Sequence, residues 1–240
     1  VPDDGKAFYG RDSMSNYFII GMKQMGVDLF DVKDGKLTIR ADKEKIRRLW
    51  DNYYVPYVNG YFASFGKFRS DDIKTGDILA YTGSVSSSMY FPDQVITDDG
   101  TRDIDCIVMQ PPVLEGGEHI CVQQGAGMAV TKSDERHEYA ACEFLKWFTR
   151  KENNLRSAYL PVRKDSNSVE ALDEVIKDKD LKVNDKAYQC LDSILSSYDL
   201  TSFYTPKCFE NGYAARKILD YDLSDKTAED KAKVDEMTAG

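Results

Sequence analysis

Histidine and tryptophan are scarce in this sequence, and its cysteines are not grouped. Two residues of each of the first two types occur among 240, and the histidines are His119 and His137. No two cysteines form a Cys-x-x-Cys pair, the spacing that structural zinc sites usually need. We therefore expect neither a metal site nor another cofactor.

The cysteines number five, so at least one thiol has no partner within the chain. We interpret them mainly as small buried hydrophobic residues. A disulfide such as Cys190–Cys208 stays open as an alternative. The five residues are Cys106, Cys121, Cys142, Cys190 and Cys208.

Long apolar runs are also absent. No stretch reaches the roughly 18 apolar residues that a membrane-spanning helix needs. The first ten residues, VPDDGKAFYG, lack the basic flank and apolar stretch of a signal peptide. Composition leaves open whether the chain is cytoplasmic or has lost an N-terminal segment.

Positive charge is in deficit, because 32 Lys and Arg face 41 Asp and Glu for a net charge of −9. This balance disfavours a nucleic-acid partner and a general attraction to anionic membranes. The hydrophobic share of 42% and the charged share of 30% are those of an ordinary globular protein. The length fits one domain or two small lobes.

Helical spacing of apolar residues alternates along the chain with short strand patterns, which predicts an α/β protein with a helical C-terminal portion. Trp147 falls on the apolar face of one predicted helix, so we expect it in the core. The predicted helices span 14–25, 42–58, 67–75, 133–150, 153–159, 168–177, 184–196, 213–223 and 227–237. A hairpin is predicted at 31–40, single strands at 78–84 and 104–112, two short strands around a glycine kink within 119–131, a bend at 97–102 and a loop at 201–212.

Signals for catalysis are weak. His119 and Cys121 fall on one face of a strand, as a thiol nucleophile and its base would, but no orienting Asn or Asp accompanies them. Gly125-Ala126-Gly127 lacks the third glycine of a dinucleotide fingerprint and the lysine of a P-loop. It suits either a strand bulge or a place where the backbone approaches a ligand. We expect no enzyme, with a hydrolase as a remote alternative.

Seven segments in order carry a family resemblance: KAFYG, FRSDDIKTGDILAYTGS, IVMQPPVLEGG, GAGMAV, EYAACEFLKWFTRKEN, AYLPVR and GYAARKILD. Together they resemble the extracellular solute-binding proteins of sugar ABC importers. The segments AYLPVR and AARKILDYDLS are most similar to the branch that binds glycerol 3-phosphate and glycerophosphodiesters.

The resemblance implies a type II, two-lobed periplasmic-binding-protein-like fold that captures solute by lobe closure and delivers it to ABC permease subunits. By analogy, 1–103 and 156–240 form the C-terminal lobe, and 104–155 are a portion of the N-terminal lobe. The expected location is extracytoplasmic, either periplasmic or lipid-anchored at the cell surface. The chain begins inside the family pattern, so we expect a truncated member whose exposed apolar surface favours self-association.

Four residues occupy the positions that contact the ligand in the resembling family: Ser84, Gly125, Tyr159 and Arg216. An Arg fork matches phosphate, carboxylate or paired hydroxyls, and a Tyr offers a ring face with a hydroxyl. Each also has a structural alternative, as a strand-end serine, a bulge, a packing tyrosine or a surface arginine.

The serine assignment can shift to one of the three serines that follow, Ser86, Ser87 and Ser88. Tyr9, Trp50 and Tyr159 are candidates for stacking on a sugar ring, with Trp50 favoured as core. The solute stays open among a sugar, an oligosaccharide and a glycerol phosphodiester. A non-catalytic interaction module is the alternative function.

Overall fold

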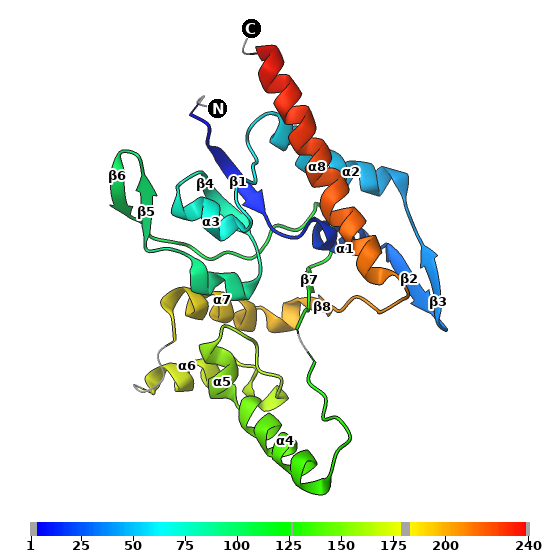
Figure 1. The fold of residues 1–240 in the computed structure, drawn as a ribbon, viewed down its shortest axis with the longest axis vertical. Coiled ribbons are helices and arrows are strands. Elements are labelled where there is room, and N and C mark those ends of the chain that lie inside the picture. The colour runs from blue at the N-terminus through cyan, green and yellow to red at the C-terminus, as the bar shows by residue number, and fades with distance from the viewer. Residues whose placement is uncertain (1–3, 126, 179–182, 239–240) are drawn as a thin grey trace.

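The computed structural model describes residues 4–125, 127–178 and 183–238, and it is a mixed α/β structure (Figure 1). Strand β1 (Ala7–Arg11) pairs in parallel with β4 (Ile78–Thr82), so that Ala7 lies opposite Ile78 and Arg11 opposite Thr82. Because the strands are parallel, their carboxyl ends meet at one edge. The strand predicted at 78–84 is confirmed over Ile78–Thr82.

The connection from β1 to β4 follows the predicted order of elements. The Asp34-Gly35 turn between β2 and β3 has positive φ at both residues, 49° and 73°, which is the turn that two-residue hairpins prefer. The elements are α1 (Met14–Gln24), the hairpin of β2 (Phe30–Lys33) and β3 (Lys36–Ile39), α2 (Lys43–Val58) and α3 (Arg69–Lys74). A 3-10 helix, η1 (Val85–Tyr90), follows β4.

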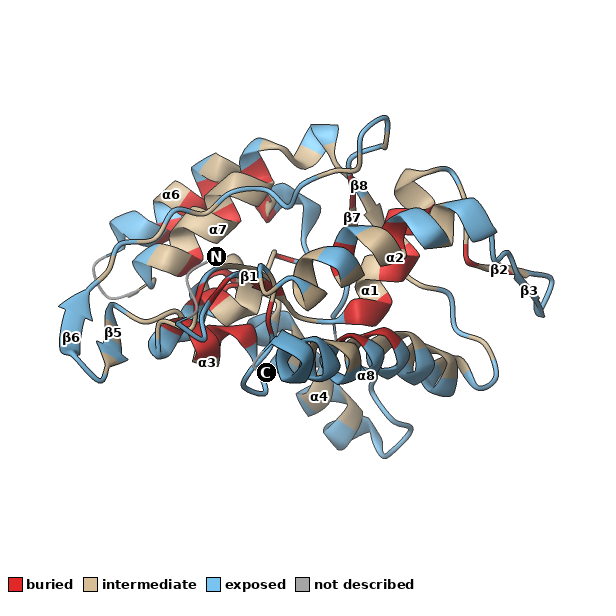
Figure 2. Cartoon of the chain, turned by 90° about the horizontal axis from the view of Figure 1, so that it is seen from above, coloured by how far each residue is buried: buried red, intermediate tan, exposed pale blue. Residues whose placement is uncertain are grey.

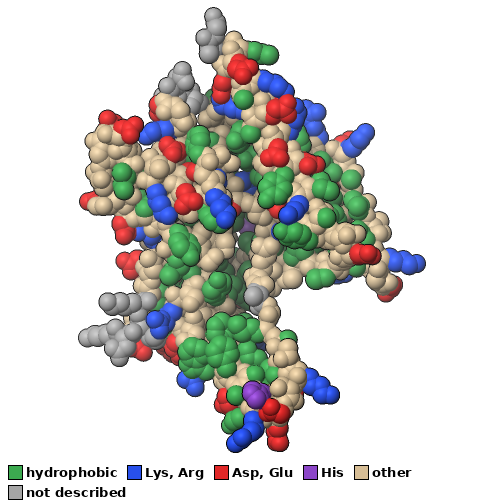
Figure 3. All heavy atoms as spheres, in the orientation of Figure 1, with side chains coloured by type: hydrophobic (Ala, Val, Ile, Leu, Met, Phe, Trp, Pro, Cys, Tyr) green, Lys and Arg blue, Asp and Glu red, His purple; other side chains and the backbone are tan. Residues whose placement is uncertain are grey.

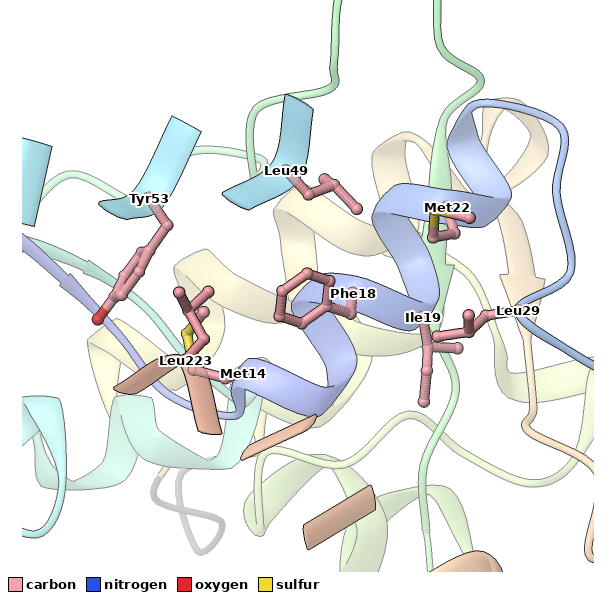
Figure 4. Packing of buried hydrophobic residues seen from close by; sticks show 8 residues of the cluster. All are labelled: Met14, Phe18, Ile19, Met22, Leu29, Leu49, Tyr53 and Leu223. Atoms are coloured by element: carbon pink, nitrogen blue, oxygen red, sulfur yellow. The ribbon is translucent and has the colours of Figure 1, made fainter. Parts of the chain in front are cut away.

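The largest core lies between α1, α2 and the C-terminal helix α8 (Gly212–Thr238) (Figure 4). Leu49 and Met22 are fully buried there, and burial of such a side chain stabilises the fold by about 1.5–3 kcal/mol. Local signals set the helix ends: Asp42 caps α2 through the amide of Glu44 at 3.1 Å, and Gly26 closes α1 with φ of 80°.

A second core joins α5 (Lys151–Arg156), α6 (Val169–Lys177) and α7 (Asp185–Ser196), all three predicted. A third lies between α3 and the β1–β4 pair. Figure 2 shows buried residues on α3, α6 and α7. The hairpin of β5 (Gln94–Thr97) and β6 (Gly100–Asp103) is mostly exposed. The remaining short 3-10 helices are η2 (Lys164–Ser166) and η3 (Tyr198–Leu200).

Two segments predicted without strands contain them. Residues 97–102 belong to the hairpin of β5 (Gln94–Thr97) and β6 (Gly100–Asp103) instead of a plain bend. The loop at 201–212 contains β8 (Ser202–Tyr204), which pairs in parallel with β7 (Ile120–Val122). The partner of β8 is about eighty residues away, so a local pattern gives no sign of it.

Other predictions were wrong in the opposite direction. Residues 104–112 form no strand, because isolated hydrogen bonds and not a ladder hold them: the Ile104 amide donates to the Asp93 carbonyl at 2.9 Å, and the Gln110 side-chain amide donates to the Ser193 carbonyl at 3.1 Å. The second strand expected within 119–131 is absent from 127–131, and residue 126 lies outside the described residues. The two terminal helices are one, since no Gly or Pro separates them and the Ser224 hydroxyl bonds back to Asp220.

Helix α4 (Glu135–Phe148) forms where predicted, but the placement of Trp147 in the core was wrong. None of its residues is buried, and Trp147 is 49% exposed. Its apolar face packs mainly on itself, with the Phe144 ring 5.7 Å from Trp147 and 5.8 Å from Phe148. Figure 3 shows hydrophobic side chains gathered on the lower part of the molecule, where α4 lies in Figure 1.

Candidate functional site

The carboxyl edge of the β1–β4 pair carries a cluster of polar loops. The loop after β1 begins with Asp12, whose amide donates to the Thr82 carbonyl at 2.9 Å, and the loop after β4 begins with Gly83 and Ser84. Ligands of open α/β sheets bind outside the carboxyl ends of parallel strands. The topology therefore makes this edge the candidate site.

Asp12 is a site residue that sequence reasoning missed. Its carboxylate accepts from the Arg69 amide at 3.2 Å and lies 3.6 Å from the Arg69 side chain. Burial raises the pKa of this carboxyl, and the nearby Arg69 opposes the rise in part. Arg69 is itself buried in an ion pair with Asp72, and this buried pair positions Asp12.

Ser84 sits at the start of η1 on the same edge. Its hydroxyl lies 3.0 Å from that of Ser86, and its carbonyl accepts from the Ser87 hydroxyl at 2.6 Å. A Cβ placed at Gly83 would come within 3.1 Å of both Asp12 and Ser87, so the absence of a side chain there brings the two loops together. Ser84 is exposed, whereas Ser88 is buried.

Arg216 is half-buried and belongs to a hydrogen-bonded chain that links three elements. Its guanidinium donates to the Asn16 side-chain oxygen at 2.8 Å, and the Asn16 amide donates to Gln124 at 3.2 Å. Asn16 is in the first turn of α1, next to the loop that contains Asp12. Asn16 and Gln124 were missed from the sequence, because neither stands in a motif.

Gly125 follows Gln124 directly and so lies at the end of this chain. It is exposed, and a Cβ added there would meet nothing within 4 Å. The close backbone approach that a glycine would permit is therefore not used by neighbouring protein atoms. The space beside Gly125 is open.

Tyr159 follows the end of α5. Tyr159 is 57% exposed, and its backbone amide donates to the Asn154 carbonyl at 3.0 Å. The next residue, Leu160, packs on the same core cluster as Val85, which follows Ser84. Within the described residues no hydrogen bond joins the four predicted residues directly.

Two of the proposed stacking residues have rings that are already packed. Tyr9 contacts Phe62 with ring centroids 4.8 Å apart, and its hydroxyl bonds Thr82 at 2.7 Å. Trp50 stacks on Tyr54 at 5.8 Å, as expected for a core-facing residue. Of the three candidates, Tyr159 leaves the most ring surface for a ligand.

Two hollows in the surface lie away from the four predicted residues. One of about 450 Å³ borders α7, and one of about 720 Å³ lies at the start of α2 beside Ile46 and Trp50. Neither is lined by Ser84, Gly125, Tyr159 or Arg216. Neither of these two hollows includes Asp12 or Gly83 at the edge of the β1–β4 pair.

The geometry disfavours thiol catalysis. His119 is exposed and lies just before β7, and burial raises the pKa of the Cys121 thiol. A nucleophilic cysteine needs the opposite shift, because the thiolate is the reactive form. In the part of the chain that the structure describes, no cluster of three or more His, Cys, Asp or Glu suits a metal ion. None of its helices is long and apolar enough to cross a membrane.

Polar loops at parallel strand ends, beside an Arg–Asn–Gln chain, are typical of proteins that bind small polar molecules. The chain belongs to the bacterial extracellular solute-binding proteins, whose family model matches residues 2–183. The resemblance found in the sequence is thereby confirmed at the level of this family. No curated protein matches the chain.

Membership gives the chain an extracellular role in solute binding and transport, with a small-molecule ligand and ABC permease subunits as partners. The matched range includes Ser84, Gly125 and Tyr159. It ends before α7, so Arg216 on α8 lies outside it. The role of Arg216 rests on its contacts with Asn16.

Proposed function

We propose that this protein captures a sugar, an oligosaccharide or a glycerol-phosphate-type solute and presents it to the permease of an ABC importer. The observation that carries the proposal is the chain from Arg216 through Asn16 to Gln124, which adjoins the loop of Asp12. It gathers a cation and two amides at the strand-end edge where α/β proteins bind ligands.

The residue types suit a solute rich in hydroxyl groups. Asn and Gln side chains both donate and accept, Asp12 accepts from hydroxyls, and Arg216 donates two parallel bonds to paired oxygens. Ser84 would add a hydroxyl from β4, and Tyr159 would cover an apolar ring face. The open space beside Gly125 would leave backbone amides free to meet the solute.

The local charge favours a neutral solute over a phosphodiester. An ionised Asp12 would offset the charge of Arg216, so the site would have little net attraction for an anion. Arg163, which follows α5, is paired with Asp165 through two hydrogen bonds of 3.1 and 2.7 Å. It is therefore not a free phosphate-binding group.

We extend the proposal to the two-lobed type II fold, with 1–103 and 156–240 in one lobe and 104–155 belonging to the other. Two features support it. Residues 104–119, which would pass from one lobe to the other, form no helix or strand. None of the residues of α4 is buried. Neither of the two hollows described above contains the site residues, and lobe closure would enclose the edge where Asp12 and Ser84 lie.

A thermal-shift screen of sugars, oligosaccharides and glycerol phosphodiesters tests the function. A solute at 100 times its Kd stabilises the folded chain by about 2.7 kcal/mol, which raises Tm by several degrees at this size. Arg216→Ala and Asn16→Ala should each abolish the shift. Arg102→Ala is the matched control, because Arg102 is exposed on strand β6 and lines neither hollow.

The outcomes separate the alternatives. A shift that survives in Arg102→Ala and disappears in Arg216→Ala supports solute capture at this edge. A shift that survives in all three variants places the solute elsewhere and contradicts the site. Silence across the whole library contradicts solute capture and favours an interaction module, which needs no small-molecule ligand.

A further inference from the structure

The extended segment after β6 runs along helix α7. Near its start, the Ile104 amide donates to the Asp93 carbonyl at 2.9 Å, and the Asp93 carboxylate pairs with Lys186 in the first turn of α7. At its other end, the Gln110 amide donates to the Ser193 carbonyl and also bonds Ser197, just past the end of the helix. Residues 104–110 are thus tethered to both ends of α7.

This arrangement places Cys106 opposite Cys190. The contacts at both ends hold 104–110 alongside 186–197. Cys106 is one third of the way along the first, and one third of the way along the second is residue 190. The hollow beside α7 agrees, because Cys106 lines it together with Tyr188 and Gln189.

The surroundings of the two thiols are shared. Burial raises the pKa of both Cys106 and Cys190, and the neighbouring charge of Cys106 adds to the rise at Cys190. Burial also raises the pKa of the Tyr81 hydroxyl, and both thiols contribute to that rise. Each thiol is half-buried, so neither is shut away from a small oxidant.

We propose that Cys106 and Cys190, both free thiols in this structure, form an intramolecular disulfide in the extracellular environment. Extracellular conditions preserve disulfides, and the family is extracellular. Because 104–110 take part in no strand ladder, Cys106 can approach Cys190 without breaking backbone pairing. The inference depends on that location and not on which solute is bound.

The oxidant is a small or protein disulfide. The thiolate of one cysteine attacks it and forms a mixed disulfide, releasing one thiol. The second cysteine then displaces the other half, so two protein thiols lose two electrons and two protons and two oxidant thiols form. The product would fasten the crossing segment to α7 beside η1, the 3-10 helix that begins just after Ser84.

Peptide mapping tests the pairing. The full chain is incubated with oxidised glutathione, alkylated under non-reducing conditions and cut with trypsin and a glutamyl endopeptidase. Cutting after Glu115 or Glu118 separates Cys106 from Cys121, and cutting after Lys207 separates Cys190 from Cys208. A linked pair of peptides carrying Cys106 and Cys190 is expected, with three of the five thiols still titratable.

Variants and stability sharpen the test. Cys106→Ser and Cys190→Ser should each remove the linked peptide, whereas Cys208→Ser should keep it. The oxidised chain should melt about 5–10 °C above the reduced chain, because the bond closes a loop of about 85 residues. A Cys190–Cys208 link, a disulfide between chains or five titratable thiols after oxidation would each overturn the proposal. Mapping the unmodified chain gives this answer even if a variant fails to fold.

Discussion

The guanidinium of Arg216 on α8 donates a hydrogen bond of 2.8 Å to the side-chain oxygen of Asn16 on α1, although 200 positions separate the two residues. The bond joins the last helix of the chain to the first. It also connects both helices to Gln124, because the Asn16 side-chain amide donates a hydrogen bond to the Gln124 side-chain oxygen.

The pair should show energetic coupling. Removing either side chain leaves a half-buried partner without its bond, so each single variant should lower the free energy of unfolding by about 1 kcal/mol. The double variant should cost less than the sum by about 0.5–1.5 kcal/mol. Urea unfolding of Arg216→Ala, Asn16→Ala and the double variant measures this, and additive losses would contradict the pairing.

Replacing Arg69 should destabilise the buried ion pair that supports Asp12. Its side chain is 3% exposed and contacts Asp72, which is 2% exposed. Arg69→Met would leave the Asp72 carboxylate buried without its cation, at a cost of about 3–5 kcal/mol in the free energy of unfolding.

Lys74→Met is the control for Arg69→Met, since Lys74 is on the same helix and its pair with Asp71 is exposed. It should cost less than about 1 kcal/mol. Chemical denaturation of the two variants compares them directly, and equal losses would mean that the Arg69–Asp72 pair is not structural.

Asp12 should give stability a defined pH dependence. Burial raises its pKa above the ordinary 3.8, so the folded chain holds this proton more tightly than the unfolded chain. The stability from Asp12 is therefore fully present below pH 3.8 and is lost as pH rises through the raised pKa.

Asp12→Asn lacks this titration, so the Tm of the original chain minus that of the variant should fall as pH rises from 3 to 7. Scanning calorimetry across that range measures the difference. A difference that grows with pH would show that Arg69 stabilises the Asp12 carboxylate more than burial destabilises it. Asp98→Asn, in the exposed turn between β5 and β6, controls for the loss of one negative charge.

The exposed face of α4 should drive self-association. Phe144, Trp147 and Phe148 are 50%, 49% and 40% exposed and form one continuous apolar patch. Sedimentation velocity should show a concentration-dependent dimer that Trp147→Lys weakens by tenfold or more in Kd. Tyr213→Lys, which changes an exposed aromatic on α8, should leave the dimer intact. A monomer at all concentrations would contradict this prediction.

Much of the local structure followed from the sequence. The cap at Asp42, the glycine stop at Gly26 and the Asp34-Gly35 turn act within a few residues, so their patterns can be recognised without knowing the fold. The ordered family segments likewise predicted the solute-binding class. Of the site, Arg216 was predicted from resemblance, and the structure adds its contact with Asn16.

The tertiary structure decided everything that depends on distant partners. Asn16 and Gln124 became candidate site residues through bonds spanning 200 and 108 positions, and β8 became a strand through β7. Helical spacing established that Trp147 shares a face with Phe144, but not whether another element covers that face. Periodicity encodes which side of an element is apolar, whereas burial requires a second surface that the local sequence does not specify.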